Sequence, residues 1–216
     1  MYLALASQPD VSYMVNRLAQ LTSDPKGVHW TAVKRIFRYL KYMKNANLTY
    51  RGNDAEIKNT ELNFFCDADW GNGLDQKSIS GYVTIIARGA IAWSSKKQQT
   101  VALSTAEAEY ITATHVTKQV LWHCSLYLEL NFSLLMTSTI FTDNQVAITI
   151  SHHPRYHAQT KHIDINYHFL PDHISARTIN TVYVNTHNNL VDLFTKGLAW
   201  INHQDLTYQI GVITWE

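Results

Sequence analysis

The chain has 216 residues, enough for one domain of ordinary size with an appendage. Hydrophobic residues make up 46% of it, which argues against a disordered chain. Lys and Arg together number 18 and Asp and Glu 17, so the net charge of +1 does not indicate a nucleic-acid binder, and any such attraction must come from local patches. Cys66 and Cys124 are far apart and form no CxxC pair, which argues against a disulfide scaffold or a four-cysteine zinc site.

The sequence contains neither a membrane-span pattern nor a signal-peptide pattern. It has no apolar run of about 18 residues, the length that a membrane-crossing helix needs. The N-terminal MYLALASQPD lacks a basic region before its short apolar stretch. We therefore expect an interior part of a longer protein, without a membrane partner, in a reducing compartment such as the cytosol or nucleus.

The first part of the chain is predicted to be helical. Apolar residues recur at helical spacing over residues 11–22 and again over 29–43, with a break at SDPKG (23–27). Four basic residues lie mostly on the other side of the second helix: Lys34, Arg35, Arg38 and Lys41. This stripe is typical of a solvated face, and the alternative is contact with phosphate groups. The polar stretch 51–61 predicts a boundary after this helical hairpin.

Strands and helices alternate beyond the boundary. Strands are expected at residues 62–66, 82–87, 90–94, 137–142 and 178–184, the second and third forming a hairpin around Arg88-Gly89. Helices are expected at 104–130, from 144, at 160–174 and at 190–198, and Ser104 with Glu107 fits a capping box. The order β-β-β-α-β-α-α-β-α predicts an α/β fold with a five-stranded mixed sheet, antiparallel at first and then parallel.

Four carboxylates fall at informative places in this layout: Asp67, Glu109, Asp143 and Asp192. Asp67 and Asp143 are expected to end the first and fourth strands, and sites in α/β sheets gather at the carboxyl ends of strands. If these two strands are neighbours, the two acids meet, and the helices could add Glu109 and Asp192. Mg²⁺ prefers oxygen ligands, and two such ions about 4 Å apart can hold a phosphodiester for hydrolysis.

Two glutamates compete for the helix position in this cluster. Glu109 shares its face with Ala113, Val116 and Val120, an apolar stripe on which a carboxylate needs a reason to lie. Glu107 has a capping task. The periodicity therefore favours Glu109 as the ligand.

Five strings resemble the ribonuclease H domain of copia-type retrotransposon polyproteins, in matching order and spacing. They are FCDADWGNGLDQKSISGYV (65–83), GAIAWSSKKQQTVALSTAEAEYI (89–111), IFTDNQVAI (140–148), HAQTKHIDINYHF (157–169) and LVDLFTKGL (190–198). Residues 8–50 resemble the segment that joins the reverse transcriptase to that domain. The resemblance covers the chain up to about Leu198.

The resemblance implies an RNase H-like fold preceded by a helical hairpin. It divides the chain into a helical segment similar to the end of the reverse transcriptase (1–55), the RNase H-like domain (60–200) and a C-terminal tail (201–216). It implies hydrolysis of the RNA strand of an RNA–DNA hybrid with two Mg²⁺ ions, for which Mn²⁺ could substitute. Asp67, Glu109, Asp143 and Asp192 match the family's catalytic, metal-binding acids. Asp67 is expected to serve both ions, Glu109 and Asp143 to complete one site, and Asp192 to help hold the other.

Contacts to the hybrid are expected from Ser104, Thr105, Asn144, Lys96 and Lys97, near the strings that carry the acids. Ser104 has the competing interpretation of a helix cap. His187 is the nearest candidate for the mobile histidine of cellular ribonucleases H, although it lies closer to the last acid than that pattern expects, and a plain surface position is the alternative.

The chain has no adjacent Asp-Asp pair of the kind a polymerase palm carries, so DNA synthesis is not expected. The expected function is a ribonuclease H-type nuclease whose partners are the hybrid and the reverse transcriptase part of the same polyprotein. The expected location is a cytoplasmic virus-like particle or the nucleus. The alternative is a catalytically inactive, hybrid-binding or connection-type module left over from a retroelement.

Overall fold

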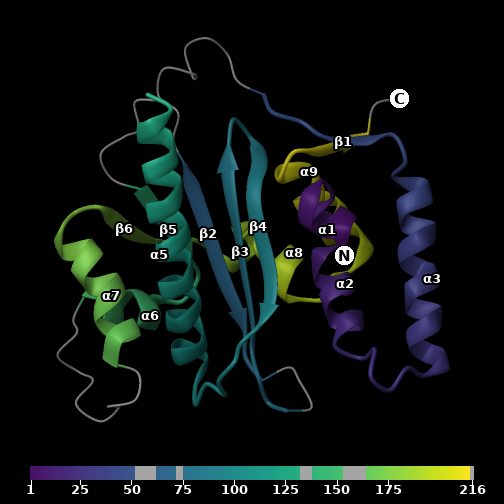
Figure 1. Cartoon of the computed structure of the whole chain (residues 1–216), viewed down its shortest axis with the longest axis horizontal. Coiled ribbons are helices and arrows are strands. Elements are labelled where there is room, and N and C mark those ends of the chain that lie inside the picture. The colour runs from purple at the N-terminus through teal and green to yellow at the C-terminus, as the bar shows by residue number, and fades with distance from the viewer. Residues whose placement is uncertain (52–61, 72–74, 132–137, 153–163, 215–216) are drawn as a thin grey trace.

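The computed structural model describes residues 1–51, 62–71, 75–131, 138–152 and 164–214, with the side chains of 164–168 left aside. Figure 1 shows a central sheet with helices on both sides of it. The predicted boundary at 51–61 falls almost wholly outside these residues, as does the first part of the predicted helix 160–174. In the described part of the chain, no helix combines the length and apolar character needed to cross a membrane.

The central sheet has five strands in the order β4-β3-β2-β5-β6. Its strands are β2 (Asn63–Asp69), β3 (Ile79–Ile86), β4 (Gly89–Lys97), β5 (Ser138–Thr142) and β6 (Ile179–Tyr183). The pairs β2–β3 and β3–β4 are antiparallel, whereas β2–β5 and β5–β6 are parallel. This confirms the predicted mixed sheet. The first and fourth predicted strands are neighbours, which is the condition under which Asp67 and Asp143 would meet.

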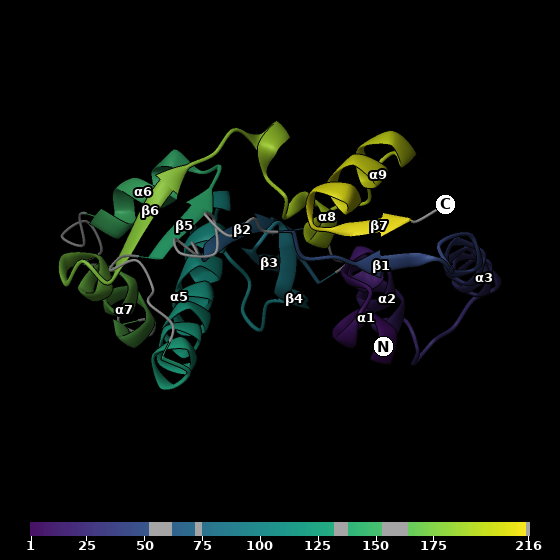
Figure 2. The same ribbon diagram turned by 90° about the horizontal axis from the view of Figure 1, so that it is seen from above.

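Helices cover both faces of the sheet, as the view from above shows (Figure 2). The long helix α5 (Thr105–Glu129) lies on one face, with α6 (Gln145–His152) and α7 (Asp164–Ser175) towards β6. The short helix α8 (Asp192–Thr195) and then α9 (Trp200–Gln209) lie on the other face. Alternation along β3 produces this division, because Tyr82 joins the apolar cluster under α5 while Val83 joins the cluster under α8.

Local signals explain where several elements begin and turn. The Ser104 hydroxyl accepts a hydrogen bond from the Glu107 N–H at 3.2 Å, and so it caps α5. The Glu107 carboxylate bonds to the N–H of Leu103 at 2.7 Å, one residue before the position that a full capping box would use. The β3–β4 hairpin turns at Ala87 and Arg88, both with positive φ, so the turn lies one residue earlier than predicted.

The N-terminal segment lies beside the edge strand β4 (Figure 1). It consists of α1 (Tyr2–Ala6), the 3-10 turn η1 (Pro9–Val11), α2 (Ser12–Ala19), α3 (Gly27–Tyr42) and β1 (Ala46–Leu48). The predicted helices 11–22 and 29–43 correspond to α2 and α3, whereas α1 was not predicted. Trp30 and Phe37, expected on the apolar face of the second helix, are 60% and 64% exposed.

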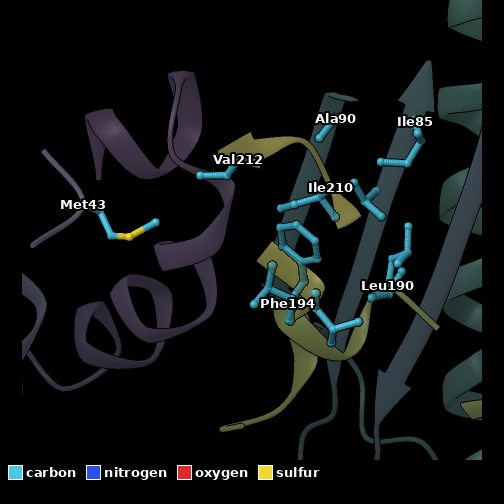
Figure 3. Packing of buried hydrophobic residues seen from close by; sticks show 11 residues of the cluster. Met43, Ile85, Ala90, Leu190, Phe194, Ile210 and Val212 are labelled. Carbon is cyan, nitrogen blue, oxygen red and sulfur yellow. The ribbon is translucent and has the colours of Figure 1, made fainter. Parts of the chain in front are cut away.

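The C-terminal residues pack back onto this segment. After α9, strand β7 (Val212–Thr214) pairs antiparallel with β1, and the Ala90 N–H donates to the Ile210 carbonyl at 2.9 Å. Met43, Val83, Phe194, Ile210 and Val212 belong to one buried apolar cluster (Figure 3). Residues from all three predicted divisions of the chain therefore contribute to a common core. The division itself remains a prediction.

Candidate metal centre

The parallel pairing of β2 with β5 sets the position of two of the predicted acids. Phe65 is aligned with Phe141, and Asp67 and Asp143 each follow two residues later. The sequence predicted that Asp67 ends its strand, and this is wrong. Strand β2 continues to Asp69 because it remains paired with β3 after its pairing with β5 has stopped.

Glu109 reaches this point from the first turns of α5. Its Oε1 accepts a hydrogen bond from the Ala68 N–H at 3.1 Å, which ties the helix to the strand beside Asp67. Asp67, Glu109 and Asp143 each offer a carboxylate oxygen, and these oxygens lie within 4.8 Å of one another. The structure thus brings together three of the four predicted acids, from strand β2, the end of β5 and helix α5.

The environment of Glu109 in this three-acid cluster disfavours its negative charge. Burial and the neighbouring Asp67 raise the pKa of Glu109 to about 10. Glu109 is 5% exposed, Asp67 is 2% exposed, and Glu109 Oε2 has no hydrogen-bond partner. A buried, unpartnered carboxylate oxygen is costly, and a divalent cation would satisfy it while relieving the repulsion. The residues present therefore fit the metal that the sequence predicts.

Asp192 lies beside this cluster and is joined to it through a lysine. The Lys196 ammonium donates to Asp192 Oδ1 at 2.6 Å and lies 3.4 Å from Asp67 Oδ2. Burial raises the pKa of Asp192, and Lys196 opposes that rise. Burial also opposes the charge of Lys196, but Asp67 and Asp192 outweigh it and hold the pKa of the lysine above its ordinary value.

The short helix α8 can approach the sheet because of a glycine. A Cβ on Gly81 would lie 2.6 Å from Thr195 Cγ2 and 2.7 Å from Val191 Cγ1. The Thr195 hydroxyl is close enough to donate to Asp67 Oδ2 and also bonds to the Val191 carbonyl at 3.2 Å. The glycine therefore lets α8 place its polar groups on Asp67.

Sequence reasoning did not identify three residues that contact the acids: Thr186, Thr195 and Lys196. Thr186 follows β6, and its hydroxyl donates to Asp143 Oδ2 at 2.8 Å. The string LVDLFTKGL did contain a signal for Lys196, since a cation four residues after Asp192 on a helix lies on the same face. Thr186 had no comparable signal, because only the fold brings the loop after β6 next to Asp143.

The residues predicted to contact the hybrid have varied surroundings. Ser104 and Thr105 are exposed at the start of α5. Asn144 directly follows Asp143, and its Oδ1 accepts from the Ala147 N–H at 3.0 Å. Lys96 is exposed on β4, while Lys97 forms an ion pair of 2.6 Å with Asp75. The β3 register places Lys96 across from Ser80, one residue from the partner of Asp67.

His187 is also exposed, within the turn η3 (Thr186–Asn188) that follows β6. Its backbone N–H is bonded to Asn185 Oδ1 at 3.0 Å. The neighbouring Thr186, rather than His187, makes the described contact with an acid of the cluster.

Comparisons with known proteins find similar segments in transposon polyproteins. The chain is 38% identical over 214 residues to the retrovirus-related Pol polyprotein from transposon RE2 of Arabidopsis thaliana, covering 98% of this chain and 14% of that protein. It is 36% identical over 197 residues to the corresponding polyprotein from transposon TNT 1-94 of Nicotiana tabacum, covering 91% of this chain and again 14% of the relative. No protein-family model matches the chain.

Among solved structures, LC11-RNase H1, isolated from compost, resembles 62% of this chain and 92% of its own, with a TM-score of 0.47 and 12% identity. The five-stranded mixed sheet flanked by helices makes the chain an α/β protein. The chain is homologous, over nearly its whole length, to a segment of the Ty1/copia-type Pol polyproteins, which confirms the resemblance seen in its strings. It spans about one seventh of the length of these relatives.

Proposed function

We propose that this chain is a ribonuclease H-type nuclease that hydrolyses the RNA strand of an RNA–DNA hybrid. The observation that carries the proposal is the three-acid cluster of Asp67, Glu109 and Asp143, with one buried Glu109 oxygen left unpartnered. Carboxylates gathered in this way, beside exposed polar side chains, suit metal-assisted hydrolysis of a phosphodiester. The relatives are transposon Pol polyproteins, which agrees with a substrate made of nucleic acid.

The cluster would hold Mg²⁺, or Mn²⁺ in its place, with Asp192 contributing to a second position beside Asp67. A divalent cation in such a site supplies an electrophile that polarises the phosphate and eases deprotonation of water. The chain's own residues orient the ligands. Ala68 holds Glu109, Thr186 holds Asp143, and the hydroxyl of Thr195 holds Asp67.

Substrate binding is assigned to the surface next to the cluster. Lys96 and Lys97 would meet phosphate groups, and Ser104, Thr105 and Asn144 would meet the sugar-phosphate backbone or 2′-hydroxyl groups of the hybrid. Overall charge is nearly balanced, so binding depends on this local surface. The reverse transcriptase portion of a longer polyprotein is the proposed protein partner, and it would add affinity that this segment lacks alone.

The test is cleavage of an end-labelled RNA annealed to DNA, with Mg²⁺, Mn²⁺ or EDTA. We expect cleavage with either metal, none with EDTA, and none on a DNA duplex of the same sequence. Asp143→Asn should abolish cleavage while leaving the fold intact. The matched control is Asp205→Asn, which changes an exposed aspartate bonded only locally to Gln209 and should leave cleavage unchanged.

The outcome that would contradict the proposal is hybrid binding without cleavage under every metal condition. Salt-sensitive binding of that kind would instead support the inactive, hybrid-binding module. Cleavage that survives in Asp143→Asn would show that the nuclease activity does not depend on this cluster.

A further inference from the structure

The ammonium group of Lys196 lies between Asp192 and the three-acid cluster. Its Nζ is 2.6 Å from Asp192 Oδ1 and 3.4 Å from Asp67 Oδ2, so one ammonium bridges the start of α8 and the middle of β2. Asp67 is also a member of the three-acid cluster. The same carboxylate therefore serves the lysine and the candidate metal site.

The local structure fixes the lysine in this place. Lys196 follows α8 directly, and its N–H donates to the Asp192 carbonyl at 3.0 Å, so backbone and side chain both return to the same aspartate. The preceding residue, Thr195, is fully buried and bonds to Asp67. The Lys196 side chain is 35% exposed, and the side chains of Asp192 and Asp67 are 17% and 3% exposed. The ion pairs that Lys196 makes with Asp192 and Asp67 are thus more enclosed than an ordinary surface ion pair.

The positive charge of Lys196 balances the negative charges of Asp67 and Asp192. Without a cation, Asp67 and Asp192 would face each other across the site with burial opposing their charge, and the ammonium compensates both. A divalent ion that used Asp192 and Asp67 would meet the same oxygens. Two cations cannot share those oxygens without repulsion at such short distances.

We propose that Lys196 is a built-in cation that occupies the Asp192 side of the site and must be displaced before a second divalent ion can bind there. The inference rests on the proposed function, since it concerns the same metal centre. Glu109 and Asp143 make no described bond to the lysine, so two of the cluster's three acids stay available to the first ion while the lysine is in place. Lys196 is thus a positioning residue that separates the two binding events.

The test counts bound Mn²⁺ on the whole chain without nucleic acid, from the electron paramagnetic resonance signal of the free ion. We expect the wild-type chain to bind one Mn²⁺, and a second with at least about tenfold weaker affinity. Lys196→Met should strengthen the second binding event about tenfold or more and lower the midpoint of thermal unfolding in EDTA. Lys26→Met is the matched control, because the Lys26 ammonium forms an exposed pair with Asp24 at 4.0 Å and the variant should change neither quantity.

Two further variants keep the test decisive if Lys196→Met folds poorly. Lys196→Gln retains a hydrogen-bond donor of similar length without the charge and should also strengthen the second event. The double variant Lys196→Met with Asp192→Asn should recover stability in EDTA and bind a single Mn²⁺. A purely structural lysine would alter stability but would not change the number or affinity of bound ions.

The outcomes separate this inference from the proposed function. The wild type could bind one Mn²⁺ while neither lysine variant binds the second Mn²⁺ more tightly. That result overturns the proposed role of Lys196 and leaves the nuclease proposal standing. Absence of Mn²⁺ binding in the wild type and all variants overturns both, through failure of the metal centre itself. Two ions bound with equal affinity by the wild type also overturn the inference.

Discussion

Gly81 lies directly opposite Asp67 in the antiparallel β2–β3 ladder, and the space above this glycine is filled by α8. Val191 and Thr195 both come within 3 Å of where a Cβ on Gly81 would be. The absence of a side chain on one strand thus determines how closely a helix can approach the acid on the next strand.

Gly81→Ala should therefore destabilise the chain and disturb the metal centre together. The added methyl group would push against α8, and overpacking of this kind typically costs about 1–3 kcal/mol. Urea unfolding should show that loss, and hybrid cleavage should fall because Thr195 and Lys196 move away from Asp67. Gly27→Ala is the control, since nothing lies within 4 Å of its Cβ position and alanine favours a helix. Unchanged stability in Gly81→Ala would refute the close approach of α8.

Glu109→Gln should change the pH dependence of stability in the metal-free chain. The pKa of Glu109 is raised from 4.5 to about 10, so the folded state holds its proton more firmly than the unfolded state does. The wild type should lose stability relative to Glu109→Gln as pH rises from about 5 towards about 10, with the two most alike below pH 4.5. Thermal unfolding in EDTA across this range measures the difference. Parallel curves for the two proteins would contradict the raised pKa.

The same variant should lose its response to metal. A ligand present at 100 times its Kd stabilises a folded protein by about 2.7 kcal/mol, so Mg²⁺ should raise the unfolding midpoint of the wild type but not of Glu109→Gln. Glu107→Gln is the control, because that glutamate bonds to the Leu103 N–H and lies outside the three-acid cluster. An equal metal-induced rise in wild type and Glu109→Gln would exclude Glu109 as a ligand.

Ile210→Ala should show that the C-terminal residues are part of the fold. Ile210 is fully buried in the cluster it shares with Val83 and Phe194, and such a truncation costs about 2–5 kcal/mol. Ile201→Ala makes the same change at a side chain that is 77% exposed and should stay within about 0.5 kcal/mol of the wild type. Urea denaturation of the whole chain compares them, and equal stabilities would mean that this segment does not pack as described.

Ser104→Ala and Thr105→Ala should separate capping from hybrid contact. Loss of the Ser104 cap on α5 should cost about 0.5–2 kcal/mol of stability, whereas Thr105 makes no described capping bond and its loss should cost less. If both side chains contact the hybrid, both variants should weaken binding in a filter or anisotropy assay. The contrary outcome is normal hybrid binding by Thr105→Ala, together with a Ser104→Ala variant that is less stable but binds the hybrid normally. Capping of α5 would then be the only role of Ser104.

Periodicity and short strings were enough to predict much of this molecule. The order of strands and helices in residues 62–198 follows from where apolar residues alternate with polar ones and where they recur at helical spacing. Both patterns can be recognised in the sequence itself. The choice of Glu109 over Glu107 also followed from a helix face. The sequence left open whether the first and fourth strands are neighbours, and the parallel β2–β5 pairing decided this.

The sequence alone determined which acids are present, on which elements they lie and in which order the strands and helices follow, because these properties depend on neighbours along the chain. Only the tertiary structure decided what surrounds the acids. Strand register and packing produce four contacts of this kind. They are the approach of α8 over Gly81, the contact of Thr186 with Asp143, the bridge made by Lys196 and the pairing of β7 with β1. Such contacts have no period or motif, since the distance between their members in sequence is set by the fold and not by the local backbone.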